Sequence, residues 1–361
     1  MKILNVGDLH LWDRELSTTR GFVENSDLML DAIIAYVEAD PEIRIVNFEG
    51  DIQHSTPATK STLLRTATWK RKLEKLGNIM LERQPTMHII QRAGVDPEKL
   101  YKQPLPLFTA EGNHDVSKTL RRVGADNKRI AIEDYTFFDD LLYSGVMQNP
   151  RGYLFRDLGK DYYIQFNNYG EATAPIPDAI ANKENIIAIK ILHDTVRFED
   201  SPSWLNYLED DVYEADDVLQ DCRLAICGHI HEPLPPKMFV NTKGKNVVFV
   251  QTGAMARTSA VDKNIRDFGY CTLLDLKDGI DIVEVQLPIM PSDEYFDWSQ
   301  IIINENKKQA LKERKGFSLS FSEFQMSAYD PRQDIANMEI ETDVKDNCIE
   351  VLDKIQGMDG V

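Results

Sequence analysis

The chain has 361 residues, of which 42% are hydrophobic, and its formal net charge is −18. This length and hydrophobic content exclude a disordered chain and allow one large domain with a smaller addition. The acidic excess excludes a general nucleic-acid coat protein, because contacts with phosphate groups need Lys and Arg, but a nuclease with a local metal site stays open.

Nothing in the sequence indicates a membrane or a secretory route. No apolar run reaches the roughly 20 residues of a membrane span, and the N-terminus becomes charged too early for a signal peptide. We therefore expect a cytoplasmic protein with no membrane partner. Its four cysteines are then reduced thiols, namely Cys222, Cys227, Cys271 and Cys348.

The first elements predict a parallel sheet. Residues 2–6 indicate a strand that ends at Gly7-Asp8, and residues 43–48 indicate a second strand that ends at Gly50-Asp51. Between them we expect a helix over 27–38, capped by Ser26. Its inward-facing residues are predicted to be Leu28, Leu30, Ile33, Ile34 and Val37. Open α/β sheets bind ligands beyond the carboxyl ends of their strands, which is where both aspartates lie.

Later segments extend this pattern and define two regions. Further strands are predicted at 105–109, 186–192, 223–227, 246–251, 269–276 and 279–287. We expect a catalytic domain over 1–290 with a basic helical insertion at 55–105. The charged side chains of this helix either face solvent or contact DNA. Residues 291–361 are expected to form a C-terminal helical docking or capping segment. Its last stretch has an apolar stripe at helical spacing, which comprises Cys348, Val351, Leu352, Ile355 and Met358. This stripe either binds a partner or packs on the chain itself.

Ligand-type side chains follow five predicted strands in turn. Asp8 and His10 lie two residues apart and therefore project to one side of an extended segment, and His229 and His231 repeat this spacing. Three further candidates follow other strands, namely Asp51, Asn113 and His193. A single Asp-x-His pair usually has a structural role. Five segments that each place ligand-type residues after a predicted strand are very rarely found together by chance. Carboxylate and imidazole groups suit two divalent ions about 3.5–4 Å apart that act on a phosphoester.

These motifs resemble the full signature of the calcineurin-like metallophosphoesterases. The resemblance covers roughly residues 1–275 and implies a four-layer α/β sandwich, in which two packed mixed β-sheets are flanked by helices. It implies that one metal is held by Asp8, His10, Asp51 and His231. It implies that the second is held by Asp51, Asn113, His193 and His229, so that Asp51 bridges the pair. His114 would contact the scissile phosphate and act as a catalytic residue.

A finer resemblance points to the SbcD-type DNA-repair nucleases. It is carried by Gly50-Asp51-Ile52-Gln53-His54, by residues 108–115 and by the turn at 252–257, which includes Arg257. It implies a DNA exonuclease or endonuclease subunit that uses two divalent ions. Manganese is expected ahead of iron, zinc or magnesium. It also implies DNA as a partner, with an SMC-like ATPase subunit as a further expected partner. Apart from this resemblance, a homodimer is a further expectation.

Two interpretations stay open beside this one. The chain could instead be a phosphodiesterase for cyclic nucleotides or dinucleotides, with the 56–105 insertion as a lid. A non-enzymatic scaffold is disfavoured because every ligand position is filled. The role of His54 is similarly open, since a histidine three residues beyond a metal ligand can face the substrate or support the ligand.

Overall fold

The computed structural model describes most of the first 307 residues. The described ranges are 1–54, 63–92, 105–115, 118–123, 128–133, 136–177, 180, 183, 185–199, 201, 212–259 and 265–307. For 118–123 and 128–133 only the backbone is described. The chain divides into two units, Met1–Trp298 and Ser299–Val361. The predicted apolar stripe at 348–358 lies outside the described residues, as does the start of the predicted basic helix at 56–62.

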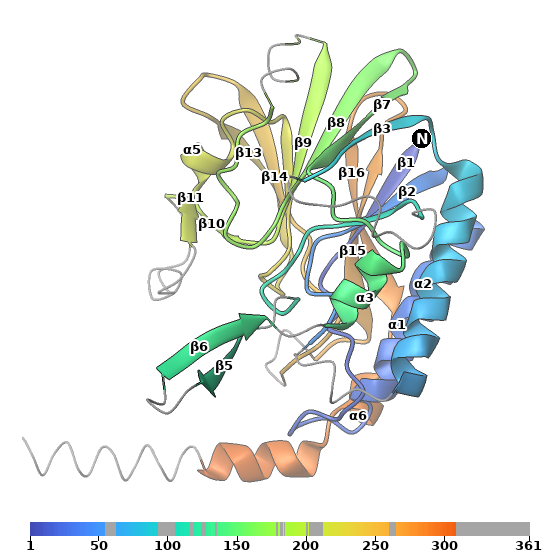
Figure 1. Cartoon of the computed structure of the whole chain (residues 1–361), viewed down its shortest axis with the longest axis vertical. Coiled ribbons are helices and arrows are strands. Elements are labelled where there is room, and N and C mark those ends of the chain that lie inside the picture. Colours follow the sequence, from blue (N-terminus) through green and yellow to red (C-terminus); the bar gives the residue numbers. More distant parts are fainter. Residues whose placement is uncertain are drawn as a thin grey trace, which may run out of the picture. The chain divides into compact units, whose positions relative to one another are not determined.

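The first unit is built around a five-stranded mixed sheet (Figure 1). Its strand order is β16 (Asp281–Pro288), β15 (Phe268–Asp275), β1 (Lys2–Val6), β2 (Ile43–Phe48) and β4 (Leu107–Thr109). β1, β2 and β4 run parallel, whereas β15 and β16 are antiparallel to their neighbours. The parallel trio therefore brings the residues that follow Val6, Phe48 and Thr109 to the same edge of the sheet.

A second mixed sheet has seven strands. Its order is β13 (Leu234–Val240), β14 (Asn246–Gln251), β12 (Leu224–Cys227), β9 (Ile186–Leu192), β8 (Lys160–Asn167), β7 (Gly152–Asp157) and β3 (Met87–Ile90). The central strands β14, β12, β9 and β8 are parallel, and the outer strands are antiparallel. Two small two-stranded sheets pair β5 (Lys118–Val123) with β6 (Lys128–Glu133) and β10 (Thr195–Arg197) with β11 (Val212–Glu214).

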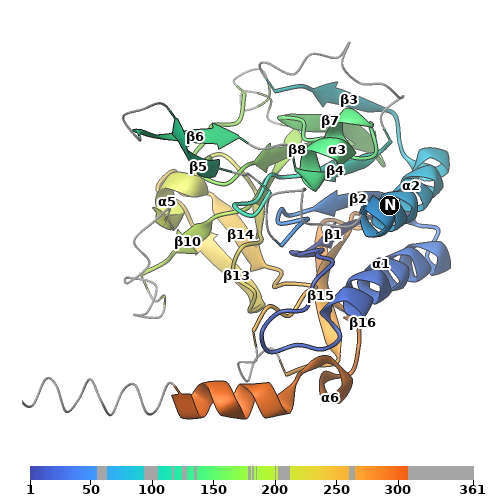
Figure 2. The same ribbon diagram turned by 60° about the horizontal axis from the view of Figure 1, so that its bottom comes forward.

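Three apolar clusters show how the layers pack. The first fills the space between the five-stranded sheet and the helices α1 (Phe22–Ala39), α2 (Leu63–Arg83) and α3 (Phe137–Tyr143). The second lies between the two sheets, and the third packs α5 (Ala215–Val218) on the outer face of the seven-stranded sheet. In β1, Leu4 contributes to the helix side and Ile3 to the sheet side. The predicted architecture of two packed mixed sheets flanked by helices is confirmed (Figures 1 and 2).

The first helix is longer than predicted. It begins at Phe22, and Ser26 lies inside it with its hydroxyl donating to the Phe22 carbonyl at 3.1 Å, so Ser26 is not the cap. Leu28, predicted to face inward, is 42% exposed, while its neighbour Met29 is buried. The predicted inward positions Leu30, Ile33, Ile34 and Val37 are buried. The buried residues Ser26, Met29 and Ile33 recur at the spacing of three or four that one helix face requires, so Met29 and not Leu28 lies on the inward face.

The basic side chains of α2 pair with acidic groups of the same chain. Lys70 contacts Asp140, and Lys72 contacts Asp31, both at 2.8 Å. Other pairs join Arg65 to Asp27 and Lys75 to Glu38. α1 and α2 lie side by side against the sheet (Figure 1), so α1 supplies most of these acidic partners. The positive charge of α2 is therefore largely balanced within the fold.

The first unit ends in a buried segment. The short helix α6 (Ser292–Tyr295) is followed by Phe296, and both Tyr295 and Phe296 are fully buried. The guanidinium group of Arg257, also fully buried, lies 3.9 Å from the Tyr295 ring centre and donates to the Met290 carbonyl at 2.6 Å. Residues 292–298 thus belong to the same unit as the sheets. Arg257, noted in the sequence, acts here as a packing residue.

Candidate metal centre

The predicted ligands lie on loops that leave the carboxyl ends of parallel strands. Asp8 and His10 follow β1, and Asp51 follows β2. Asn113 follows β4, which belongs to the same sheet. The other candidates leave the second sheet, with His193 after β9 and with His229 and His231 after β12. The two sheets therefore bring their ligand-bearing edges together, although the loops are separated by up to 223 residues of sequence, from 8 to 231.

One group of side chains consists of Asp8, His10 and His231. His10 Nε2 and His231 Nε2 lie 2.9 Å apart, and His231 Nε2 lies 3.5 Å from Asp8 Oδ2. Asp51 Oδ2 is 3.6 Å from His10 Nε2. Two imidazole nitrogens this close, with two carboxylates beside them, form a set of lone pairs that converge on one point. This is a donor set that a divalent transition metal prefers.

A second group consists of Asp51, His193 and His229. His193 Nε2 lies 3.2 Å from Asp51 Oδ2 and also 3.2 Å from Asn113 Oδ1. The other ring nitrogen of His193 is 2.8 Å from the Glu49 carbonyl oxygen, so Nδ1 carries the proton and Nε2 points toward the carboxylate and amide oxygens. Asp51 thus contacts a histidine of each group, as a bridging ligand must.

Three of these residues hold unusual backbone conformations. His10, Asp51 and His229 have φ values of 46°, 47° and 71°. Among the described residues the one other non-glycine with positive φ is Leu158, in the turn between β7 and β8. Left-handed conformations cost about 1–2 kcal/mol for residues with a Cβ atom. Such strain gathers where side chains must be aimed at a functional point, and here it falls on three candidate ligands.

Glycines before the candidate ligands allow close approach. A Cβ atom on Gly112 would lie 2.1 Å from Asp51 Oδ1, and one on Gly50 would lie 2.3 Å from the His193 ring. A Cβ atom on Gly228 would lie 2.7 Å from Asp8 Oδ1. Gly50 also has a φ of 117°, which suits glycine. The space at these glycines lets the carboxylates and the imidazole ring reach the centre, so the residues present fit a pair of divalent ions.

Burial and mutual charge shape the titration of this cluster. Burial raises the pKa of Asp8 to about 7. Burial alone would lower the pKa of His193, but the carboxylates of Asp51 and Asp8 outweigh it and raise that pKa to about 10. Burial lowers the pKa of His231 to about 4. The two carboxylates therefore attract positive charge, which protons on His193 or divalent ions can supply.

The floor of the centre is buried and its rim is open. Asp8, His10, Asp51 and His193 are at most 1% exposed. The rim is formed by partly exposed residues, namely His54, Asn113, His114, His229 and His231. Among the described residues, the cluster is therefore closed at its floor and accessible at these side chains.

His114 lies on this rim beside the candidate bridging carboxylate. Its backbone N–H donates to Asp51 Oδ1 at 2.8 Å, and its ring Nδ1 contacts the backbone carbonyl of His54. That contact assigns the ring proton to Nδ1 in the neutral form and leaves Nε2 available. The imidazole rings of His54 and His114 are stacked, with centres 5.5 Å apart and planes at 17°. Both rings also lie near His10, within 4.9 to 5.3 Å.

Several supporting residues were not predicted from the sequence. The buried Asp115 accepts hydrogen bonds from the backbone of Gly112 at 3.0 Å and of Gln53 at 3.2 Å, and so ties two ligand loops together. Trp12 lies against His54, and Tyr169 lies against His229. Asp115 is the last residue of the motif Gly112-Asn113-His114-Asp115, so its position in the motif could have indicated a supporting role. No feature of the sequence indicates a role for Tyr169.

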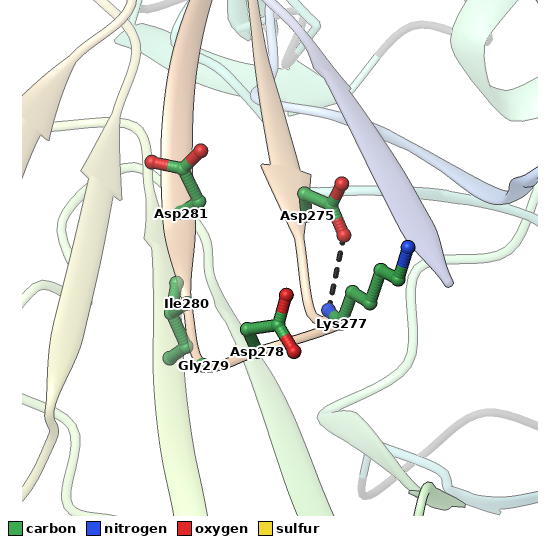
Figure 3. A pocket seen from close by; sticks show the side chains of 6 residues that line it. All are labelled: Asp275, Lys277, Asp278, Gly279, Ile280 and Asp281. Atoms are coloured by element: carbon green, nitrogen blue, oxygen red, sulfur yellow. Dashed lines mark hydrogen bonds between the residues drawn. The ribbon is translucent and has the colours of Figure 1, made fainter.

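A surface hollow elsewhere in the fold is unconnected with this cluster. It has a volume of about 300 Å³ and is lined by Asp275, Lys277, Asp278 and the next three residues, as Figure 3 shows. Lys2 at the start of β1 pairs with Asp275, so the hollow lies at the edge of the sheet opposite to Asp8.

Within the described part of the chain, no helix combines the length and apolar character needed to cross a membrane.

No family model and no curated protein matches this sequence. Among solved structures, the chain is similar to the NAD nucleotidase of Haemophilus influenzae, with 13% sequence identity and a TM-score of 0.37. The match covers 80% of this chain and 50% of the nucleotidase, so this chain spans about half of that protein's length.

Proposed function

We propose that this chain is a phosphodiesterase that depends on two divalent metal ions. One ion would be held by Asp8, His10, Asp51 and His231, and the other by Asp51, Asn113, His193 and His229. The observation that carries this proposal is the position of Asp51, whose Oδ2 lies 3.6 Å from a histidine of one group and 3.2 Å from a histidine of the other. Bound divalent ions supply positive charge to a phosphate group and lower the pKa of water.

The protein's own groups would position and protonate the substrate. The carboxylates of Asp8 and Asp51 are buried, so they determine where positive charge collects. His114 lies on the open rim with Nδ1 bound to the His54 carbonyl, so a protonated His114 has its Nε2–H free to donate to a leaving oxygen. General acid catalysis of this kind contributes about 10²–10⁴-fold in rate.

For the substrate, we propose DNA, with manganese as the metal. This finer proposal rests on the resemblance of residues 50–54 and 108–115 to SbcD-type nucleases, and on the stacking of His54 against His114. An SMC-like ATPase partner remains a prediction of the same resemblance, and a homodimer remains a separate prediction. Co-purification with an SMC-like ATPase encoded beside this gene tests the first prediction. Light scattering of the isolated protein tests the second.

A specific observation favours the second candidate, a phosphodiesterase for cyclic nucleotides or dinucleotides. Arg65, Lys70, Lys72 and Lys75 of α2 are all engaged with acidic side chains of the same chain. A helix whose charges are balanced in this way contributes little to binding a DNA backbone, because that binding depends on releasing counterions from phosphates. A small substrate has no need of such a basic surface.

The deciding experiment compares substrates at equal concentrations of protein and Mn²⁺. Linear duplex DNA, a cyclic dinucleotide and bis(p-nitrophenyl) phosphate are supplied in parallel, with EDTA controls. Hydrolysis of the aryl diester that EDTA abolishes supports the phosphodiesterase proposal. Degradation of DNA supports the nuclease, and activity on the cyclic dinucleotide without DNA degradation favours the second candidate. Failure on all three substrates with Mn²⁺, Fe²⁺, Zn²⁺ and Mg²⁺ would remove the proposed function.

A variant of His54 tests the nuclease separately. We expect His54→Ala to retain both metal ions and to lose at least about 10-fold in duplex degradation, equivalent to roughly 1.4 kcal/mol in the barrier. The loss on the aryl diester should be clearly smaller. His88→Ala is the matched control, because His88 is an exposed histidine in β3. Equal losses on both substrates would make His54 a support for the metal ligands.

A further inference from the structure

An aromatic ring lies beside His54, whose own ring is centred 5.3 Å from that of the candidate ligand His10. The partly buried indole of Trp12 lies 4.7 Å from the His54 ring, centre to centre. The backbone around it is held firmly, because Leu11 N–H donates to the Ile52 carbonyl at 2.9 Å and His54 N–H donates to the Leu11 carbonyl at 3.1 Å. The loop after β1 and the loop after β2 thus fix the indole at the rim of the centre.

A second aromatic ring lies beside the second group of candidate ligands. The ring of Tyr169 is centred 5.5 Å from that of His229 and 6.4 Å from that of His193, and the side chain is partly exposed. Tyr169 N–H donates to the Glu111 carbonyl at 2.8 Å. Gly170 N–H donates to Asp194 Oδ1, also at 2.8 Å. Tyr169 is therefore anchored between the loop that carries Asn113 and the loop that carries His193.

Tyr169 is thus a direct neighbour of the second group of ligands, whereas Trp12 neighbours the first group through His54. A phosphodiester has two ester groups, one on either side of its phosphorus atom. When the phosphate lies on the metal-ligand cluster, its two substituents extend outward past the rim. Trp12 and Tyr169 are both partly exposed, and partly exposed aromatic side chains can bind planar groups by stacking. Nucleobases stack on such rings whatever the base sequence.

We propose that Trp12 and Tyr169 form stacking subsites for the nucleobases on the two sides of the scissile phosphate, so that the substrate is a phosphodiester between nucleosides. This inference rests on the proposed phosphodiesterase function and narrows its substrate class. It applies to nucleobases of a small dinucleotide and to those of a polynucleotide strand, which share the same planar chemistry.

The test uses two esters with the same leaving group. Thymidine 5′-(p-nitrophenyl phosphate) carries a nucleobase, whereas methyl p-nitrophenyl phosphate does not, and both release p-nitrophenol. We expect the wild-type protein with Mn²⁺ to prefer the thymidine ester by at least about 10-fold in kcat/KM, mainly through a lower KM. Equal kcat/KM values for the two esters would overturn the inference.

Variants then assign the preference to the two rings. In Trp12→Leu and Tyr169→Leu we expect kcat/KM for the thymidine ester to fall by about 5- to 100-fold, the range for losing one stacked base. The loss should fall on KM and should exceed the loss on the methyl ester several-fold in at least one of the two variants. Trp12→Phe and Tyr169→Phe keep a flat ring and should restore the preference to within about threefold of wild type.

Metal content separates stacking from simple packing against the ligands. Each variant should retain the wild-type amount of bound Mn²⁺, measured by mass spectrometry of the purified protein. Equal losses on both esters, accompanied by loss of metal, would show that the rings only support the imidazoles, and would overturn the inference.

A binding measurement tests the inference even if the protein hydrolyses none of the phosphodiesters. Calorimetry with thymidine 5′-monophosphate and Mn²⁺ should give binding to the wild-type protein that weakens at least about fivefold in Trp12→Leu or Tyr169→Leu. Binding that is absent from the wild type, or unchanged in both variants, would overturn the inference. A thymidine dinucleotide and a 12-residue single strand, used as competitors, distinguish a small-molecule source from a polynucleotide.

Discussion

The backbone N–H of His114 donates a hydrogen bond of 2.8 Å to Oδ1 of Asp51. The other oxygen of the same carboxylate, Oδ2, lies between the histidines of the two candidate metal groups. The candidate acid is therefore connected directly to the carboxylate that joins the two groups. This arrangement makes the positions of His114 and of the metals depend on one side chain, and it leads to the first two predictions.

Replacement of Asp51 should abolish both metal binding and activity. Asp51→Ala removes the carboxylate shared by the two groups, so two cations would lie close together without the anion between them. We expect loss of nearly all hydrolysis and of most bound metal, while the circular dichroism spectrum stays native. Asp278→Ala, at the exposed turn of the opposite sheet edge, serves as the control. Near-normal turnover of Asp51→Ala in excess Mn²⁺ would contradict the assignment.

Replacement of His114 should separate catalysis from metal binding. The ring of His114 is assigned no metal, and its backbone N–H survives in His114→Ala. We therefore expect full metal content and a rate lowered by about 10²–10³-fold, as for other losses of one transition-state contact. The leaving group provides a further test. The loss of rate should be smaller for a p-nitrophenyl ester, whose p-nitrophenolate leaves without taking up a proton, than for an ester whose leaving alkoxide needs one. A halved metal content would instead identify His114 as a ligand.

A methyl group at Gly112 should displace the bridging carboxylate. In Gly112→Ala the added Cβ would lie 2.1 Å from the side-chain atom Oδ1 of Asp51 and 2.4 Å from the backbone nitrogen of the same residue. We expect metal affinity to fall by at least about 10-fold, equivalent to 1.4 kcal/mol. Gly159→Ala is the matched control. Its φ of 79° makes alanine cost about 1–2 kcal/mol of stability, but nothing lies within 4 Å of the added atom. If both variants bind metal alike, the close approach at Gly112 has no role.

Metal binding should release protons at neutral pH. The pKa of His193 is raised to about 10, because Asp51 and Asp8 outweigh the effect of burial, so the imidazole is protonated at pH 7. A divalent ion needs the neutral ring and must displace that proton. We therefore expect affinity for Mn²⁺ to rise with pH between 7 and 10, by up to about tenfold per unit for one proton. Calorimetry in buffers of different ionisation enthalpy counts the protons. A count of zero at pH 7 would exclude this role for His193.

Truncation should show where the first unit ends. Removal of residues 299–361 leaves the unit Met1–Trp298 complete, and we expect it to fold and to hydrolyse the aryl diester. Removal of residues 292–361 also deletes the buried rings of Tyr295 and Phe296 and uncovers the Arg257 guanidinium. Loss of two buried aromatic side chains costs several kcal/mol, so we expect that shorter chain to be insoluble or to melt at least about 10 °C lower. Equal melting temperatures would contradict this boundary.

Local patterns in the sequence predicted the strands that carry the centre. β1, β2, β9 and β14 match the predicted ranges, and β4, β12, β15 and β16 agree within two residues at either end. These strands are apolar because they are covered on one or both faces. A buried strand therefore has a run or an alternation of apolar residues that can be recognised in the sequence. The glycine, aspartate and histidine residues that follow them are chemically distinctive, so the amino-acid sequence was enough to identify the candidate ligands.

Other elements could not be found in this way. β7 and β8 were not predicted, and their sequences mix aromatic residues with charged residues such as Arg156 and Asp161, which pair on an exposed face. The acidic partners of the α2 lysines were equally hidden, because they lie on other helices. Asp31, the partner of Lys72, lies on α1 and is 41 residues away, and Asp140, the partner of Lys70, lies on α3 and is 70 residues away. Periodicity reports that a face is buried or charged, but it does not report which element covers that face.

The sequence by itself determined which side chains can bind metal and which strands deliver them. Tertiary structure decided that Asp51 touches both groups, that His10, Asp51 and His229 hold left-handed backbones, and that Trp12 and Tyr169 stand at the rim. The physical reason is that the contacts of Asp51, Trp12 and Tyr169 join loops from different strands, and that the three strained backbones are held by the surrounding structure. The distances of these contacts are set by packing between layers, which no local stretch of sequence encodes.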